Sequence, residues 1–98
     1  MSSTFRVTPR AAADLIGIGR YTQKKWGKKQ RDLYLRDLDR RFAWLAKNPK
    51  LAKHRLDINS EYYCYPQGAH LIFFICNGAN IDIIGIPHKS MDVLDYFD

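Results

Sequence analysis

The spacing of apolar residues changes near Leu56, and this change constrains the fold more than any other feature of the sequence. Before Leu56, apolar side chains recur every three or four residues, as on one face of an α-helix; after it they alternate or form short unbroken runs. A chain of 98 residues has the size of one domain. The sequence therefore predicts a single α+β domain, residues 1–98, with its helices before most of its strands.

Two helices are expected in the first half of the chain. Thr8 and Pro9 suit the start of the first helix, because a hydroxyl caps free amides and proline has no amide to leave unpaired. Gly27 suits its end. A second helix should run from about Lys28 to Lys47 and stop at Asn48-Pro49. Its apolar residues share one face: Tyr34, Leu35, Leu38, Phe42 and Leu45. The short link between the helices predicts an antiparallel helical hairpin.

Short strands are expected on both sides of this hairpin. The strand-forming segments are residues 5–7, 62–65, 70–76 and 81–86, and the last three are separated by turns at Pro66–Ala69 and Asn77-Gly78. The N-terminal strand and the helical hairpin should pack on a small antiparallel β-sheet. Because the run from His70 to Cys76 is apolar on both sides, either the tail or another chain must cover the face that the hairpin leaves open. In the tail, residues 89–98, a short helix is expected with Ser90 as its N-cap.

Charge is unevenly distributed along the chain. Up to Leu56 there are 15 Lys and Arg against 4 Asp, and from Asp57 onward there is one Lys against 6 Asp and Glu; the net charge is +6. The basic half suggests an acidic partner, either nucleic acid or protein, and a solvated helix surface is the alternative. The basic run Lys24–Lys29 includes Trp26 and suggests either a phosphate contact or a solvated turn.

No catalytic or metal-binding pattern stands out. His54, His70 and His88 lack the spacing of metal ligands, and there is no glycine-rich phosphate loop or nucleophile motif. Between Leu56 and His88 there is no Lys or Arg, so the sheet region offers no cation to stabilise a phosphoryl transition state. We therefore expect no catalytic residue, no bound metal and no cofactor.

The sequence also predicts a cytoplasmic protein without membrane contact. A membrane span needs about 20 apolar residues, whereas the longest apolar run extends from Leu71 to Cys76. The segment Met1–Arg6 lacks the apolar core of a signal peptide.

Several stretches resemble the ParE toxins of the RelE/ParE superfamily, which belong to bacterial type II toxin–antitoxin pairs. They span nearly the whole chain: Thr8, Ala12, Asp14-Leu15, Ile18, Tyr21 and Trp26-Gly27; Phe42, Leu45-Ala46 and Asn48-Pro49; His70-Leu71-Ile72-Phe73-Phe74; and Ile86-Pro87-His88-Lys89-Ser90-Met91-Asp92. The order of these stretches, with the histidine-to-Met-Asp ending after an Ile-rich strand, is fairly specific to ParE-like members.

This resemblance implies a function. ParE-like toxins inhibit DNA gyrase, trapping it with cleaved DNA and blocking replication. A ParD-like antitoxin with a DNA-binding half and a toxin-wrapping C-terminal segment neutralises them. The resemblance thus implies two partners, a ParD-like antitoxin and gyrase, with DNA contacted only through one of them.

Two alternatives accompany this interpretation. RelE-like relatives cleave mRNA on the ribosome with basic residues of the sheet and C-terminus, and the absence of cations after Leu56 argues against that activity. Many family members open the second strand with an arginine-bearing pattern, where this chain has Glu61-Tyr62-Tyr63. A ParE-like protein that binds its partner without toxicity is therefore the other alternative.

The antitoxin site is predicted on the helical hairpin and near the tail. Leu38, Phe42 and Leu45 are the candidate apolar anchors, and the alternative is that all three are core residues. The remaining candidates are the charged rim Arg36, Arg40 and Arg41 and the tail aromatics Tyr96 and Phe97.

Overall fold

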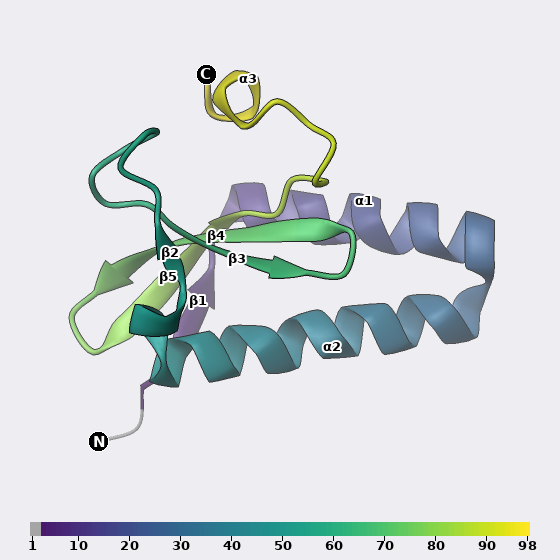
Figure 1. Cartoon of the computed structure of the whole chain (residues 1–98). Coiled ribbons are helices and arrows are strands. Elements are labelled where there is room, and N and C mark those ends of the chain that lie inside the picture. The colour runs from purple at the N-terminus through teal and green to yellow at the C-terminus, as the bar shows by residue number, and fades with distance from the viewer. Residues whose placement is uncertain (1–2) are drawn as a thin grey trace.

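The computed structural model describes residues 3–98 and has an α+β fold, as the sequence predicts (Figure 1). The elements are β1 (Phe5–Val7), α1 (Pro9–Trp26), α2 (Lys28–Lys47), the 3₁₀ turn η1 (Pro49–Leu51), β2 (Lys53–His54), β3 (Tyr63–Gln67), β4 (His70–Asn77), β5 (Asn80–Gly85) and α3 (Val93–Phe97). The five strands form one sheet in the order β1-β5-β4-β3-β2. Helices α1 and α2 form the predicted antiparallel hairpin (Figure 1).

The sheet is mixed rather than wholly antiparallel, which corrects one part of the prediction. Strands β2 to β5 pair antiparallel, but β1 pairs parallel with β5, with Phe5 opposite Ile81. After β1 the helical hairpin crosses one face of the sheet, and the chain rejoins the sheet at β2, on the opposite edge. Strand β1 therefore stays at the first edge, where it lies beside β5. Strand β2 was not expected, because Lys53 and His54 are polar and exposed.

The predicted helix boundaries are confirmed. The Thr8 hydroxyl accepts a hydrogen bond from the amide of Ala11 and donates one to the carbonyl of Ile83, so the same side chain caps α1 and ties it to β5. Gly27 separates the two helices with a φ of 93°, a conformation that suits glycine. The turn after β3 is shorter than predicted, because Pro66 and Gln67 pair with β4 and belong to the strand.

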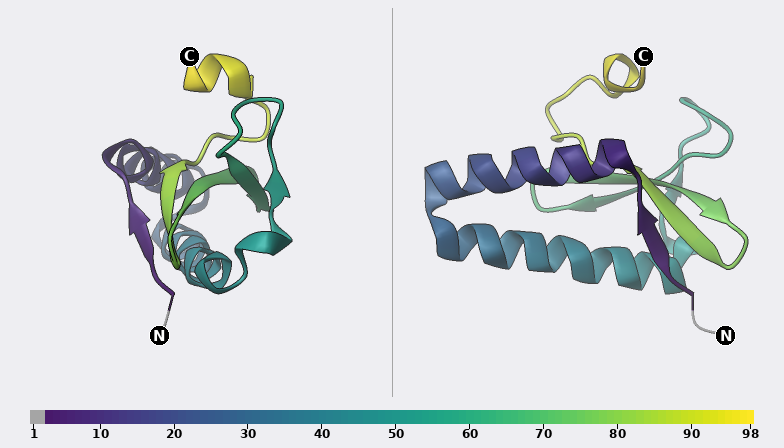
Figure 2. Two further views of the ribbon diagram at one scale, coloured as in Figure 1. Left: turned by 90° about the vertical axis from the view of Figure 1, so that its left-hand side faces the viewer. Right: turned by 180° about the vertical axis from the view of Figure 1, so that it is seen from behind.

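The central strand β4 is covered on both faces. Ile72 and Phe74 point into the core formed with the helical hairpin. Phe73 lies on the opposite face, where the ring of Phe97 packs against it with 4.9 Å between ring centroids. The tail therefore supplies the second cover, and Figure 2 shows α3 on the far side of the sheet from α2.

The tail helix begins two residues later than predicted. Its N-cap is Asp92, whose carboxylate accepts hydrogen bonds from the amides of Leu94 and Asp95. Ser90 bonds instead to the imidazole of His88. None of the helices in residues 3–98 has the length and apolar character needed to cross a bilayer.

Candidate functional site

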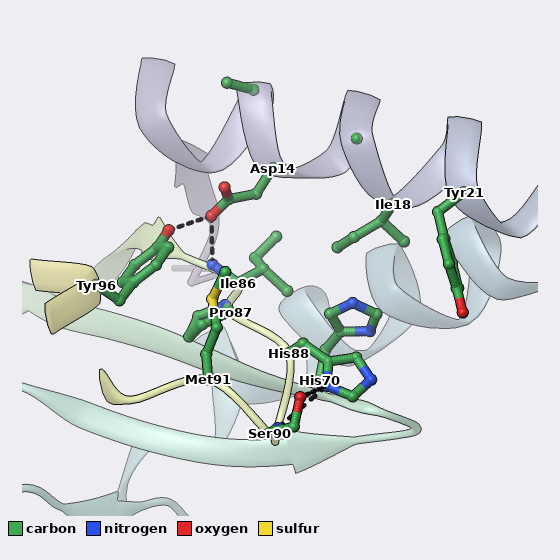
Figure 3. A pocket seen from close by; sticks show the side chains of 12 residues that line it. Asp14, Ile18, Tyr21, His70, Ile86, Pro87, His88, Ser90, Met91 and Tyr96 are labelled. Atoms are coloured by element: carbon green, nitrogen blue, oxygen red, sulfur yellow. Dashed lines mark hydrogen bonds between the residues drawn. The ribbon is translucent and has the colours of Figure 1, made fainter. Parts of the chain in front are cut away.

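A pocket of about 490 Å³ opens where α1, the start of β4 and the tail meet (Figure 3). Helix α1 contributes Asp14, Ile18 and Tyr21, and His70 comes from β4. The segment that follows β5, residues 86–98 and called the tail from here on, contributes the remaining labelled side chains: Ile86, Pro87, His88, Ser90, Met91 and Tyr96. The tail is held beside β4 by backbone hydrogen bonds from Leu71 to Pro87 and from Lys89 to Ala69.

Asp14 fastens the tail to α1 at one end of this pocket. Its carboxylate accepts hydrogen bonds from the amide of Ile86, at 2.8 Å, and from the hydroxyl of Tyr96 (Figure 3). Burial, with a further contribution from the bond to Asp14, raises the pKa of Tyr96 to about 12. Arg10 donates to the backbone carbonyl of Tyr96 and lies 4.3 Å from the centre of its ring. We call Arg10, Asp14 and Tyr96 the tail latch.

Two histidines stand at the other end of the pocket. The Nδ1 of His70 is 2.6 Å from the hydroxyl of Tyr34, and the Nδ1 of His88 accepts from the amide of Ser90 at 3.1 Å. The two imidazole rings meet edge to face at 5.3 Å. Burial lowers the pKa of His70, and a positive charge on His88 would lower it further. Burial therefore favours the neutral form of the His70 imidazole, although the nearby Asp14 acts in the opposite direction.

The side chains that line this pocket bear on whether it could carry out phosphoryl transfer. None of the described residues that line the pocket is Lys or Arg, although such a reaction needs cations aimed at the developing charge. Both Nδ1 atoms are already engaged by hydrogen bonds. Over residues 3–98, no group of three His, Cys, Asp or Glu side chains is placed to hold a metal ion.

A second, basic surface lies on α2. Arg40, Arg41 and Trp44 line a cavity of about 450 Å³ together with Asp37 and Gln67. Arg41 donates to the side-chain oxygen of Gln67 at 2.8 Å, and its guanidinium lies 4.7 Å from the ring centre of Trp44.

The residues predicted for antitoxin binding separate into three groups. Leu38, Phe42 and Leu45 have exposed fractions of 0%, 1% and 0% and form the core, which was the alternative left open for them. Arg36 and Arg40 are exposed on α2, and Arg41 is half-buried beside them. Tyr96 and Phe97 lie on α3, on the other side of the sheet from α2 (Figure 1).

The structure also corrects the inference that the sheet lacks cations. Arg6 pairs with Asp82 on the neighbouring strand at 3.2 Å. Arg55 binds both carboxylate oxygens of Asp57, each at 2.9 Å, and its guanidinium lies 5.6 Å from the ring centre of Phe73. Cations from the first half of the chain thus reach the sheet. Arg6 and Arg55 are each paired with a carboxylate, and Lys53 of β2 is exposed and forms no ion pair within residues 3–98.

Comparison with known proteins identifies the family. The family model described as the ParE toxin of the type II toxin–antitoxin system parDE matches residues 5–93. The chain is 33% identical over 94 residues to toxin ParE1 of Mycobacterium tuberculosis, a match that covers 95% of this chain and 96% of the relative. The chain belongs to the ParE toxin family of type II toxin–antitoxin systems.

Further similarities agree with this assignment. Toxin ParE1 of Caulobacter vibrioides is 30% identical over 88 residues, covering 90% of this ParE-family toxin and 91% of the relative. A solved structure of the chromosomal ParDE system from P. aeruginosa superposes with a TM-score of 0.74 at 20% identity, covering 90% of this chain and 96% of that one. At that identity the superposition shows a shared fold.

Sequence reasoning did not find the tail latch of this ParE-family toxin. Asp14 lies on the helix face that also carries Ala11 and Ile18, three residues before and four residues after it. An acidic side chain among apolar neighbours on one helix face indicates a specific hydrogen-bond partner, because burying an unpaired charge is costly. That partner is Tyr96, 82 positions away, and no local pattern points to it.

Proposed function

We propose that this ParE-family toxin inhibits DNA gyrase by binding to it, trapping the enzyme with cleaved DNA and so blocking replication. The observation that carries the proposal is the family match over residues 5–93, which includes all five strands and both long helices. Gyrase inhibition of this kind needs a shaped surface and no catalytic group of the toxin.

The geometry of the pocket supports inhibition by binding. Lys and Arg do not occur among the described residues that line the pocket. Arg55, whose guanidinium lies 5.6 Å from the ring centre of Phe73 on the outer face of β4, is held by both oxygens of Asp57. An RNA-cleaving site would need such a cation free to meet the transition-state charge.

Arg55 also lies close to the segment where many family members carry an arginine and this chain has Glu61-Tyr62-Tyr63. Its backbone amide donates to the carbonyl of Tyr62 at 2.8 Å. An arginine therefore lies next to the start of β3, although it comes from the preceding segment. This placement favours a toxic protein over one that has kept only partner binding.

The second part of the proposal is neutralisation by a ParD-like antitoxin. We place its acidic segment along the exposed Arg36 and Arg40 and over the cavity beside Trp44, where apolar and cationic groups occur together. Arg41 forms the inner wall of this site. The half-buried Tyr96 and Phe97 on α3 provide a separate apolar contact for the part of the antitoxin that reaches the opposite side.

The proposal is tested with purified gyrase. The toxin should stop supercoiling of relaxed plasmid and increase the amount of cleaved plasmid recovered after denaturation, and prior mixing with the cognate antitoxin should prevent both effects. A parallel assay follows ribosome-bound mRNA. Specific mRNA cleavage with unaffected supercoiling would replace this function with that of a RelE-like ribonuclease, and inactivity in both assays would leave a non-toxic binding protein.

A further inference from the structure

The tip of the helical hairpin carries a concentration of positive charge that neither the fold nor the tail latch uses. Between residues 15 and 31 there are six Lys and Arg and no Asp or Glu. We call the exposed cations Arg20, Lys24, Lys25, Lys28 and Lys29, together with Trp26, the basic tip. None of these cations forms an ion pair with another residue of the described chain, whereas Arg31 behind them pairs with Asp32.

Two of these lysines lower the stability of α2, the helix that begins with them. Lys28 and Lys29 are the first residues of α2, where the helix dipole is positive and acidic residues are favoured. The first turn of α2 contains no acidic residue, and no side chain caps it. A local arrangement that weakens the fold is expected where a function depends on it.

Trp26 adds an apolar group in the middle of this charge. Its side chain is 64% exposed, and the ammonium of Lys25 lies 5.6 Å from the centre of its ring. The two views from opposite sides show that the hairpin end carrying Trp26 projects beyond the turn between β3 and β4 (Figure 1, Figure 2). The basic tip is thus a narrow protrusion that can approach a large partner without hindrance from the sheet.

We propose that the basic tip binds the phosphodiester backbone of DNA. Lysine is depleted at protein–protein interfaces, whereas phosphate contacts in nucleic-acid complexes are made largely by Lys and Arg. Trp26 is placed to lie against sugar or exposed base, as aromatic side chains among cations do in nucleic-acid sites. The antitoxin surface differs in its cations: Arg40 and Arg41 line the cavity beside Trp44, whereas four of the five cations of the basic tip are lysines.

This inference goes beyond gyrase inhibition and does not depend on it. It gives the toxin a direct DNA contact in addition to the contacts made through gyrase or the antitoxin. DNA binding by the isolated toxin can therefore succeed or fail independently of the supercoiling assay.

The test compares two charge reversals. Lys28→Glu with Lys29→Glu alters the basic tip, and Lys50→Glu with Lys53→Glu alters exposed lysines at the other end of the molecule. Each pair changes the formal net charge from +6 to +2, so any effect of total charge is the same in both. The probe is a short fluorescein-labelled DNA duplex of mixed sequence, and its anisotropy is titrated with each protein at several salt concentrations.

The expected result is specific to the tip. The tip variant should bind DNA about tenfold or more weakly at low salt, and the slope of log affinity against log salt should decrease by about 0.9 for each phosphate that the variant no longer neutralises. The control variant should keep most of the parent's affinity and slope. Because glutamate suits the start of α2, the tip variant should melt at the same temperature as the parent or higher, which excludes unfolding as the cause.

Two outcomes would overturn the proposal. Equal losses of affinity in the two variants would show that DNA responds to total charge and not to the tip. Binding of poly-L-glutamate to the parent more tightly than the duplex, with the same dependence on Lys28 and Lys29, would assign the tip to an acidic protein partner.

Discussion

The two ends of the helical hairpin differ in what their charged side chains do for the fold. At the end that joins the sheet, Arg6 is paired with Asp82, and Asp14 receives hydrogen bonds from the amide of Ile86 and the hydroxyl of Tyr96. At the tip, the cations around Trp26 form no ion pairs within residues 3–98, and Lys28 and Lys29 oppose the helix dipole. The comparison indicates that the sheet end maintains the fold, whereas the tip contributes little to stability and is available for partners.

The largest difference is expected between a core aromatic and the exposed aromatic of the tip. Phe42→Ala should lower the free energy of unfolding by about 3–5 kcal/mol, because it leaves a cavity between α2 and Phe5. Trp26→Ala should change it by about 0.5 kcal/mol or less. Urea unfolding measures both, and comparable losses in the two variants would remove the distinction between the ends.

The tail latch should give the next largest effect. Asp14→Ala leaves the amide of Ile86 without its partner, and we expect a loss of about 1–3 kcal/mol in the free energy of unfolding. Asp14→Asn, which keeps one acceptor oxygen, should lose less. Hydrogen exchange at the Ile86 amide should accelerate in the alanine variant; unchanged exchange would show that Asp14 does not hold the tail.

His70 should make the sheet end sensitive to acid. Its pKa is lowered in the folded protein, mainly by burial and also by His88, so below about pH 6.5 the unfolded chain takes up a proton that the folded chain resists. Stability should therefore decrease as the pH falls from neutral to about 5. His70→Gln should lose less stability over this range. The same pH dependence in parent and variant would assign the effect to another group.

The smallest effect on stability is expected at the antitoxin surface. Arg36→Glu with Arg40→Glu should change the free energy of unfolding by about 0.5 kcal/mol or less and weaken antitoxin binding, most strongly at low salt. Arg41 is left unchanged because it bonds to Gln67. Lys50→Glu with Lys53→Glu is the matched control. Unchanged antitoxin affinity at low ionic strength would move the site away from α2.

The sequence predicted the structural features that are determined by residues close together in the chain. Thr8 and Gly27 act within one helical turn, and the bounds of α1 and α2 follow from them. The parallel placement of β1 and the bond between Asp14 and Tyr96 depend on segments more than 70 residues apart. The cations of the sheet were missed for the same reason, because Arg6, Lys53 and Arg55 reach it from outside the stretch between Leu56 and His88.

The central claim is that the toxin stops gyrase by binding and not by catalysis. The most direct measurement is the supercoiling rate after incubation with increasing toxin, at a gyrase concentration well above that needed for half-maximal inhibition. We predict that activity falls in proportion to added toxin, reaches its minimum at a fixed toxin-to-gyrase ratio, and does not fall further with longer incubation. Complete inhibition by toxin far below the gyrase concentration, progressing with time, would contradict the account and reveal an enzyme.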